Sequence, residues 1–216
     1  GGIDLAPYIF MNNGKRTAVF ITSRGCPYRC SFCWNLMFHG RRYIAWSPQK
    51  VEAELRPLLD RKIEKVLVFD SFVGPISRVH AMGEIFRRHG LEWAIEDGCR
   101  VDCHSSEEFF RGLKDTGCTH VAFGSESGSQ RILDLLCKDI TVDDILQSAR
   151  LSSAWGIRGR YQWMTGIPGE TKDDTLRTVG LIDEISRIHP SAAHSLELYL
   201  PYPGNELFDR ACRTGW

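Results

Sequence analysis

The sequence lacks an excess of charge of either sign, with 27 basic and 27 acidic residues among its 216. Nucleic-acid-binding proteins usually present a strongly basic surface, so a nucleic-acid partner is unexpected. The sequence also lacks any apolar run approaching the ~18 residues of a membrane span. Its first residues, GGIDLAPYIF, have neither the basic start nor the long apolar core of a signal peptide. We therefore expect no membrane partner.

The sequence does not have the form of a disulfide scaffold, although it contains eight cysteines. Such scaffolds are short secreted chains, whereas 43% of this long chain is hydrophobic, which is enough for an apolar core. A reducing, cytoplasmic compartment is therefore expected. Cys118, Cys137 and Cys212 are predicted to be buried thiols. Cys99 and Cys103, in CRVDC, are either buried thiols as well or part of a second metal site.

Six short β-rich stretches alternate with amphipathic helical stretches along the chain. The β-rich stretches are RTAVFITS, KVLVFDS, EWAIEDG, CTHVAFGS, RYQWMTGI and HSLELYL. Strand–helix units repeated in this way predict a parallel sheet with right-handed crossovers, and apolar strands buried on both faces fit such a sheet. Eight units would close a barrel of ~250 residues. The sequence therefore predicts an α/β fold, a parallel six-stranded (β/α)6 partial TIM-type barrel.

Helix starts and buried faces can also be predicted from the sequence. Ser47 before Pro48 is typical of an N-cap, and Thr171 is predicted to cap the helix that follows it. Ser105 and Glu108 form a capping-box pattern that opens another helix. In the helix after Thr171, the helical period predicts that four apolar side chains point inward: Leu176, Val179, Ile182 and Ile185.

The cysteine-rich segment SRGCPYRCSFCW follows the first predicted strand, at the sheet edge where ligands bind in such folds. Cys26, Cys30 and Cys33 lie within it and lack a fourth cysteine nearby. Zinc sites are usually built from two ligand pairs, and a redox C-x-x-C at Cys30 and Cys33 leaves Cys26 unexplained. Iron–sulfur clusters generally take four thiolates, so three leave one iron open. Two alternatives remain: a structural zinc module, or an electron carrier with Cys99 or Cys103 as fourth ligand.

CPYRCSFC resembles the C-x3-C-x-aromatic-C signature of the radical S-adenosylmethionine (radical SAM) superfamily, with Phe32 as the aromatic residue. The resemblance extends over nearly the whole chain. It implies that Cys26, Cys30 and Cys33 hold a [4Fe–4S] cluster whose open iron is chelated by S-adenosylmethionine. An electron from a low-potential donor then cleaves the sulfonium to methionine and a 5′-deoxyadenosyl radical.

The family resemblance also suggests residues for the methionine and ribose ends of S-adenosylmethionine. Asp70 and Ser71 end the second predicted strand and would bind the methionine ammonium; a turn or helix cap is the alternative. Related chains often have Asp-Asp-x-Phe where this one has Asp-Ser-x-Phe. GSESGS resembles the family's Gly-x-Glu-Ser/Gly stretch, so Ser125 and Glu126 would reach the ribose or the methionine end. A glycine-rich turn before a helix is the alternative there.

The segment GIPGET after the fifth predicted strand resembles the family's Gly-x-Pro-Gly-Glu/Gln-Thr turn. It suggests Gly166, Ile167 and Pro168 as cofactor contacts, with Ile167 and Phe32 on the two sides of the adenine. Arg160, at the start of the fifth strand, is expected to bind the cofactor carboxylate or a ribose hydroxyl. A surface arginine is the alternative.

LPYPGNEL (200–207) and IDLAP (3–7) resemble segments of the cobalamin-binding radical SAM class. This resemblance implies that residues 1–16 are a linker from an N-terminal cobalamin-binding domain outside this chain and that residues 17–216 are the catalytic domain. DCHSSE (102–107) nearly matches the cobalamin signature Asp-x-His-x-x-Gly. It has Glu107 in place of the glycine, so we interpret it as a helix start.

The class implies a cobalamin-dependent radical methyltransferase that acts on a small-molecule or peptide substrate. Cobalamin-assisted rearrangement or cyclisation, or methylthio transfer to transfer RNA or protein, are the enzymatic alternatives. Trp34, Tyr199 and Tyr202 are candidates to face the substrate or the second cofactor; core packing is the alternative for each.

Overall fold

The structure is a computed structural model, and it describes residues 4–215. Its main feature is a curved sheet with strand order β1-β2-β5-β6-β7-β8-β9. The strands are β1 (Ile9–Asn12), β2 (Lys15–Phe20), β5 (Lys65–Phe69), β6 (Glu92–Cys99), β7 (Cys118–Glu126), β8 (Arg158–Thr165) and β9 (Ala193–Leu198). All neighbours from β2 to β9 are parallel. The predicted partial barrel of six parallel strands is therefore confirmed.

A seventh strand, β1, extends the sheet at its N-terminal edge. It runs antiparallel to β2, with Ile9 opposite Ala18. The connecting residues Asn13 and Gly14 have φ of 50° and 76°. Both central residues of a type I′ hairpin turn need positive φ, and Asn-Gly is the preferred pair. The Asn-Gly signal was present in the sequence, and part of the predicted linker, residues 1–16, belongs to the sheet.

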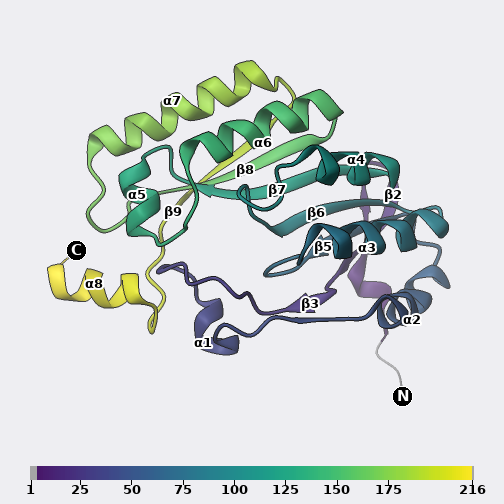
Figure 1. Cartoon of the computed structure of the whole chain (residues 1–216). Helices are drawn as coiled ribbons and strands as arrows, with labels where there is room; N and C mark the ends of the chain where they lie inside the picture. The colour runs from purple at the N-terminus through teal and green to yellow at the C-terminus, as the bar shows by residue number, and fades with distance from the viewer. Residues whose placement is uncertain (1–3, 216) are drawn as a thin grey trace.

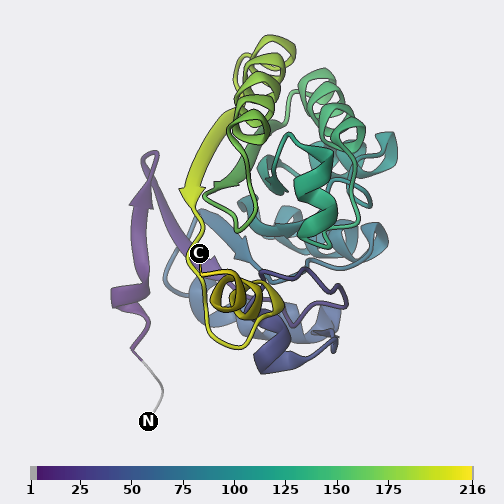
Figure 2. The ribbon, with the colours of Figure 1, turned by 90° about the vertical axis from the view of Figure 1, so that its left-hand side faces the viewer.

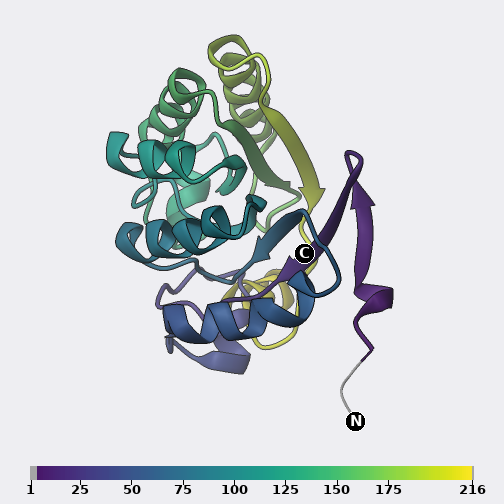
Figure 3. The same cartoon turned by 90° about the vertical axis from the view of Figure 1, so that its right-hand side faces the viewer.

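The long helices cover the convex side of the sheet, and short elements gather where the parallel strands end (Figures 1, 2 and 3). The covering helices are α2 (Pro48–Leu59), α3 (Ile76–Arg88), α4 (Glu107–Asp115), α6 (Val142–Trp155) and α7 (Lys172–Ile188). The short elements at or beside the strand ends are β3 (Ser23–Arg24), α1 (Asn35–His39), β4 (Ile44–Ala45), α5 (Gln130–Leu135) and α8 (Glu206–Thr214). A 3-10 turn, η1 (Ala6–Tyr8), precedes β1.

The apolar core lies between the sheet and these covering helices. On β8, Tyr161 and Trp163 are fully buried in this core, whereas Arg160, Gln162 and Met164, which alternate with them, are only partly buried. Successive side chains of a strand point to opposite faces, so the second set faces the concave interior. The prediction of strands buried on both faces is therefore wrong for β8, because the half-barrel is open on its inner side.

The predicted helix starts are correct except for one. Ser47 and Thr171 accept hydrogen bonds from the backbone of the first helical turn, as expected. For α4, however, the N-cap is Ser106, whose Oγ accepts from the Phe109 amide at 3.1 Å. The predicted cap, Ser105, has a buried Oγ with no hydrogen-bond partner among the described residues. The N-cap of α4 therefore lies one residue later in the chain than the predicted one.

The predicted inner face of α7 is also partly wrong. Leu176 and Val179 are 57% and 50% exposed, whereas Leu181 and Ile185 are buried. Polar contacts at the start of the helix set this rotation. Asp174 accepts a hydrogen bond from Ser129 Oγ at 2.6 Å, and Thr178 Oγ1 accepts from the Gly128 amide at 2.9 Å. These bonds direct a polar side of α7 towards the β7–α5 turn.

Among residues 4–215, no helix combines the length and apolar character needed to cross a bilayer.

Candidate functional site

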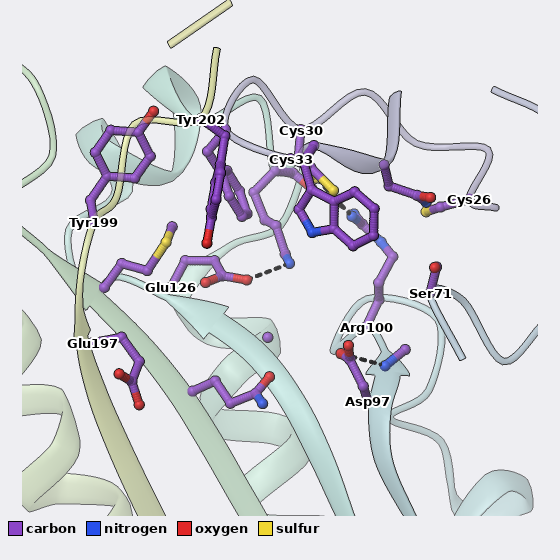
Figure 4. Close-up of a pocket in the computed structure, with 18 of the residues that line it drawn as sticks. Cys26, Cys30, Cys33, Ser71, Asp97, Arg100, Glu126, Glu197, Tyr199 and Tyr202 are labelled. Carbon is purple, nitrogen blue, oxygen red and sulfur yellow. Dashed lines mark hydrogen bonds and ion pairs between the residues drawn. The ribbon is translucent and has the colours of Figure 1, made fainter. Parts of the chain in front are cut away.

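A cavity of about 430 Å³ lies at the carboxyl ends of the parallel strands. The cysteine segment forms one wall of it, and β6, β7, β8 and β9 form the other (Figure 4). Predicted site residues that line it are Cys26, Cys30, Phe32, Cys33, Trp34, Ser71, Glu126, Tyr199 and Tyr202. Its position is where ligands bind in parallel α/β sheets.

The cysteine segment is held in place by backbone bonds to distant parts of the chain. The Ser31 amide donates to the Leu136 carbonyl at 2.9 Å, and the Ser31 carbonyl accepts from the Leu207 amide at 3.0 Å. Asn205 Nδ2 donates to the Phe32 carbonyl at 3.0 Å. The turns after α5 and before α8 therefore clamp the segment, which explains how LPYPGNEL contributes to a site 170 residues away.

Arg100 links the cysteine segment to the charged groups of the cavity. Its guanidinium lies 3.7 Å from the centre of the Tyr28 ring, and its Nη1 lies 3.8 Å from Cys30 Sγ. It also forms a two-point ion pair with Asp102 at 3.0 and 3.1 Å and donates to the Lys138 carbonyl at 2.5 Å. Arg100 therefore places a fixed positive charge beside Cys30.

Burial affects the pKa of the other two thiols of the motif. Burial raises the pKa of Cys26, and it raises that of Cys33 to about 11. Thiolates are the form that binds metals, so loading this site would release protons.

The three cysteines of the motif line the same cavity. Figure 4 shows Cys30 and Cys33 at the top of the cavity and Cys26 further along its wall. Within the described part of the chain, no group of three metal-ligating side chains is placed to hold one ion. Three soft thiol donors on one cavity, with Arg100 beside them, fit the donor set of an iron–sulfur cluster.

A buried ion pair faces the cysteine segment across the cavity. Lys138 Nζ lies 2.7 Å from Glu126 Oε1, and the two side chains are 9% and 10% exposed. Burial by itself would lower the pKa of Lys138, but the negative charges of Glu126 and Cys30 outweigh it and the pKa is raised. Lys138 Nζ also lies 5.7 Å from the centre of the Phe32 ring. The pair therefore presents a fixed positive and a fixed negative group to a zwitterionic ligand.

The predicted adenine contacts lie in one apolar cluster. Ile167 is buried with Ile132, Leu136, Tyr199 and Leu207, and Phe32 packs against this group. Phe32 lines the cavity, whereas Gly166, Ile167 and Pro168 are not among its lining residues. The Gly166 amide donates to Glu170 Oε2 at 2.6 Å, which fixes the turn behind the cavity wall. These three residues thus support the wall and do not form its surface.

Asp70 does not line the cavity, although the neighbouring Ser71 does. Its carboxylate is buried and accepts hydrogen bonds from the backbone amides of Thr22 and Ser23 at 2.7 and 3.0 Å. A contact between Asp70 and the methionine ammonium stays a prediction. In this structure the Asp70 carboxylate ties the end of β5 to the chain after β2, which is neither a turn nor a helix cap.

Ser125 and Arg160 also lie off the cavity surface. Ser125 is fully buried, and its Oγ has no partner among the described residues. Arg160 Nη1 is 2.7 Å from Glu96 Oε2, below the cavity. Neither is placed as a direct contact to a ligand held at the cysteines.

Trp34 and Tyr202 are half exposed at the cavity mouth, whereas Tyr199 is 4% exposed and belongs to the apolar cluster around Ile167. Cys99 lines the cavity wall and is 3% exposed. Cys103 lies 3.7 Å from the Tyr28 hydroxyl. Neither of these two cysteines joins a group of three metal-ligating side chains within residues 4–215.

Sequence reasoning missed six polar residues that line the cavity, namely Asn35, Asp97, Arg100, Lys138, Gln162 and Glu197. Gln162 had a visible signal, since it is a polar residue between Tyr161 and Trp163 in a predicted strand. Arg100 and Lys138 follow β6 and α5 in irregular segments, where no periodicity shows which way a side chain points.

Curated relatives match over nearly the whole chain at low identity. An uncharacterised methyltransferase of Pyrococcus horikoshii is 27% identical over 92% of this chain and 43% of its own length. An anaerobic magnesium-protoporphyrin IX monomethyl ester cyclase of Rubrivivax gelatinosus is 26% identical over 96% of this chain and 37% of its own length. The chain thus spans about two fifths of the length of these relatives.

Solved structures share the fold. The radical S-adenosylmethionine methyltransferase TsrM of Kitasatospora setae, solved with cobalamin and a [4Fe-4S] cluster, matches with a TM-score of 0.76 at 20% identity. The match covers 93% of this chain and 37% of that one. The cobalamin-dependent S-adenosylmethionine radical enzyme OxsB matches with a TM-score of 0.64 at 20% identity over 91% of this chain and 30% of that one.

One family model, described as the radical SAM superfamily, matches residues 20–182. That range includes the cysteine segment and the strands β5, β6, β7 and β8 around the cavity, which is well over half of the chain. With its three cysteines at the mouth of a parallel half-barrel, this chain belongs to the radical SAM superfamily.

Proposed function

We propose that the chain is the catalytic domain of a cobalamin-dependent radical S-adenosylmethionine methyltransferase acting on a small molecule or peptide. The observation that carries this proposal is the placement of Cys26, Cys30 and Cys33 on one cavity, facing the Glu126–Lys138 pair. Cys26, Cys30 and Cys33 would hold a [4Fe–4S] cluster. When bound, the cluster supplies the electron that cleaves S-adenosylmethionine to methionine and a 5′-deoxyadenosyl radical.

The residues of the chain would orient the cofactor and keep water away from it. Lys138 is a partner for the methionine carboxylate, and Glu126 is a partner for the ammonium or a ribose hydroxyl. Phe32 offers an aromatic wall for the adenine, backed by the Ile167 cluster. Ser71, which lines the cavity on the β5 side, remains a candidate for the methionine end.

Cobalamin would be bound mainly by a region outside this chain. Two observations support this part of the proposal. The structural relatives TsrM and OxsB were solved with cobalamin, and each is much longer than the part that this chain matches. Trp34 and Tyr202 are half exposed at the cavity mouth, where a second cofactor or a substrate would approach.

Anaerobic reconstitution with iron and sulfide, followed by reduction with S-adenosylmethionine, tests the enzyme proposal. We expect the full-length protein to bind iron and sulfide and to release 5′-deoxyadenosine or methylated product. Cys30→Ala should lose the bound iron. Cys212→Ala should keep it, because Cys212 is exposed on α8 and the prediction that it is buried is wrong. Equal iron content in Cys30→Ala and wild type would show that the cluster assignment is wrong.

A methylthiotransferase is the second candidate, because a tRNA-2-methylthio-N(6)-dimethylallyladenosine synthase of Syntrophus aciditrophicus is 26% identical over 80% of this chain. Corrinoid content separates the two candidates. The cobalamin proposal requires that the full-length protein purified from cobalamin-supplied cells contains bound corrinoid. A corrinoid-free protein that still cleaves S-adenosylmethionine would favour the methylthiotransferase.

A further inference from the structure

A second polar cluster lies inside the half-barrel, below the cavity. It consists of Glu96 on β6, His120 on β7 and Arg160 on β8. Glu96 Oε1 lies 2.8 Å from His120 Nε2, and Glu96 Oε2 lies 2.7 Å from Arg160 Nη1. The three strands are neighbours in the sheet, so a single carboxylate connects two basic side chains across its concave face.

The cluster continues the inner surface of the cavity. Arg160, Gln162 and Met164 alternate with the buried core residues of β8, and the last two line the cavity. Two residues along a strand correspond to roughly 6.6 Å, so Arg160 lies one layer below the lining residues. Its side chain is 41% exposed, although β8 is paired with a strand on each side. The concave face at this depth is therefore open to a ligand.

Arg160 keeps part of its hydrogen-bonding capacity free. Glu96 is 10% exposed and uses both carboxylate oxygens, one for each basic partner. Arg160 makes one hydrogen bond within the described part of the chain, from Nη1. A guanidinium carries five N–H donors. Glu96 thus fixes the side chain, and its remaining donors are left for an external acceptor, such as a carboxylate or phosphate.

Two other charged side chains lie on the concave side, below and above Arg160. Lys65, nearer the amino ends of the strands, is 3% exposed and paired with Glu92 at 2.7 Å. Glu197 on β9 lines the cavity above, together with Lys138. Lys65 is therefore already paired and buried, whereas the Arg160 side chain is 41% exposed and accessible to an acidic ligand group.

The opposite side of the concave face is apolar. On β2 and β5, Val19 and Phe69 alternate with the core residues Phe20 and Val68, so they point inward. Val19 is 47% exposed and Phe69 is 42% exposed. Exposed apolar side chains on an inner face are typical of a binding surface. The interior thus combines an apolar side with the accessible Arg160 guanidinium.

We propose that Arg160, held by Glu96, is the subsite for an acidic group of the substrate, whose apolar body lies against Val19 and Phe69. The ligand class is an organic acid or phosphate ester with an apolar body. That this ligand is the substrate rests on the radical chemistry proposed for the cysteine cavity. Binding of the ligand depends only on Arg160, Val19 and Phe69.

Paired probes test the subsite without knowledge of the natural substrate. 1-Naphthaleneacetate and 1-naphthaleneacetamide share one apolar ring system and differ in charge. Binding to the full-length reconstituted protein is measured by calorimetry in the presence of S-adenosylmethionine. We expect the acid to bind roughly tenfold more tightly than the amide, as a hydrogen-bonded charge pair implies. Phenyl phosphate compared with phenylacetate then separates a phosphate from a carboxylate preference.

Single-residue variants test which side chains cause the preference for the acid over the amide. Arg160→Gln should bind acid and amide equally, and Arg160→Lys should retain a preference for the acid. Phe69→Ala should weaken both probes by a similar factor and leave their ratio unchanged. Arg111→Gln, at an exposed arginine of α4, is the matched control and should behave as wild type.

Two outcomes overturn the subsite: wild-type protein that does not prefer the acid, whether it binds both probes or neither, and an Arg160→Gln variant that keeps the preference. If Arg160→Gln does not fold, the wild-type comparison and Arg160→Lys still decide. Cleavage of S-adenosylmethionine by the same wild-type preparation is measured separately. Cleavage without acid preference refutes only the subsite, and acid preference without cleavage refutes only the proposed chemistry.

Discussion

At the scale of single residues, three basic side chains in and below the cavity differ in how many partners they have. Arg100 is fully engaged by Asp102, Tyr28 and the Lys138 carbonyl. Lys138 has one carboxylate partner in a buried setting, and Arg160 has one in an open setting. Arg100 therefore organises the cysteine segment, while Lys138 and Arg160 keep donors for ligands.

Removing the charge of Lys138 should destabilise the protein. Lys138→Met leaves Glu126 as a buried carboxylate without its cation, which typically costs about 3 to 5 kcal/mol. Urea denaturation of the variant and of wild type measures the difference. Adding Glu126→Gln to Lys138→Met should recover part of the loss, since no unpaired charge then remains. A single variant as stable as wild type would mean that water already reaches Glu126.

Glu96 should make the stability depend on pH. The hydrogen bond from His120, and the charges of His120 and Arg160, hold the pKa of Glu96 below its ordinary value of 4.5, although burial raises it. A carboxyl group with a lowered pKa stabilises the fold above its ordinary pKa, and this stabilisation is lost as the pH falls through the lowered value.

In Glu96→Gln, the free energy of unfolding should therefore fall less steeply below pH 4.5 than in wild type. Denaturation of the cluster-free protein at several pH values measures the two slopes. Glu52→Gln, at a more exposed carboxylate beside Arg88, is a suitable control. Parallel curves for Glu96→Gln and wild type would show that the inner cluster does not contribute.

At the scale of elements, strands and helices could be predicted from local pattern, but their rotation and exact starts could not. The six parallel strands were visible as apolar stretches, yet the inward residues of β8 depend on which side of the sheet the helices cover. The rotation of α7 follows from contacts of Asp174 and Thr178 with Ser129 and Gly128, which come from a distant segment. The helical period of the apolar residues cannot predict such contacts.

The start of α4 provides a test with two adjacent serines. Ser106→Ala should reduce stability by about 1 kcal/mol, because the Phe109 amide loses its acceptor. Ser105→Ala should be neutral or slightly stabilising, because it removes a buried hydroxyl without a partner among the described residues. Chemical denaturation of the two variants under identical conditions measures the contrast. A larger loss of stability in Ser105→Ala than in Ser106→Ala would mean that Ser105 is the N-cap.

At the scale of the whole molecule, the half-barrel brings its ligand-binding groups together from segments far apart in sequence. The cavity takes residues from the cysteine segment, from the ends of five strands and from the chain after β9. The cysteine motif could be predicted because its three ligands lie within eight residues. The position of Lys138 in the cavity could not be predicted, because Lys138 and Phe32 come together only in the folded chain.

Cofactor binding should stabilise the assembled protein. S-adenosylmethionine at a hundredfold excess over its dissociation constant should raise the free energy of unfolding by about 2.7 kcal/mol. Thermal unfolding of the anaerobically reconstituted protein, with and without the cofactor, measures this change. Cys30→Ala, which should lack the iron, is expected to show a much smaller shift. An equal shift in that variant would mean that the cofactor binds independently of the cysteines.

The alternation along β8 also has a consequence for how such a protein can change over time. Tyr161 and Trp163 are fully buried beneath the helices, whereas Arg160, Gln162 and Met164 face the open interior. Side chains that hold the core and side chains that face the interior thus occupy alternate positions of one strand. A combinatorial library restricted to Gln162 and Met164, which leaves the Arg160–Glu96 ion pair intact, would sample new ligand preferences at little cost in stability. Drift in specificity among descendants of this chain should therefore concentrate at every second residue of its strands.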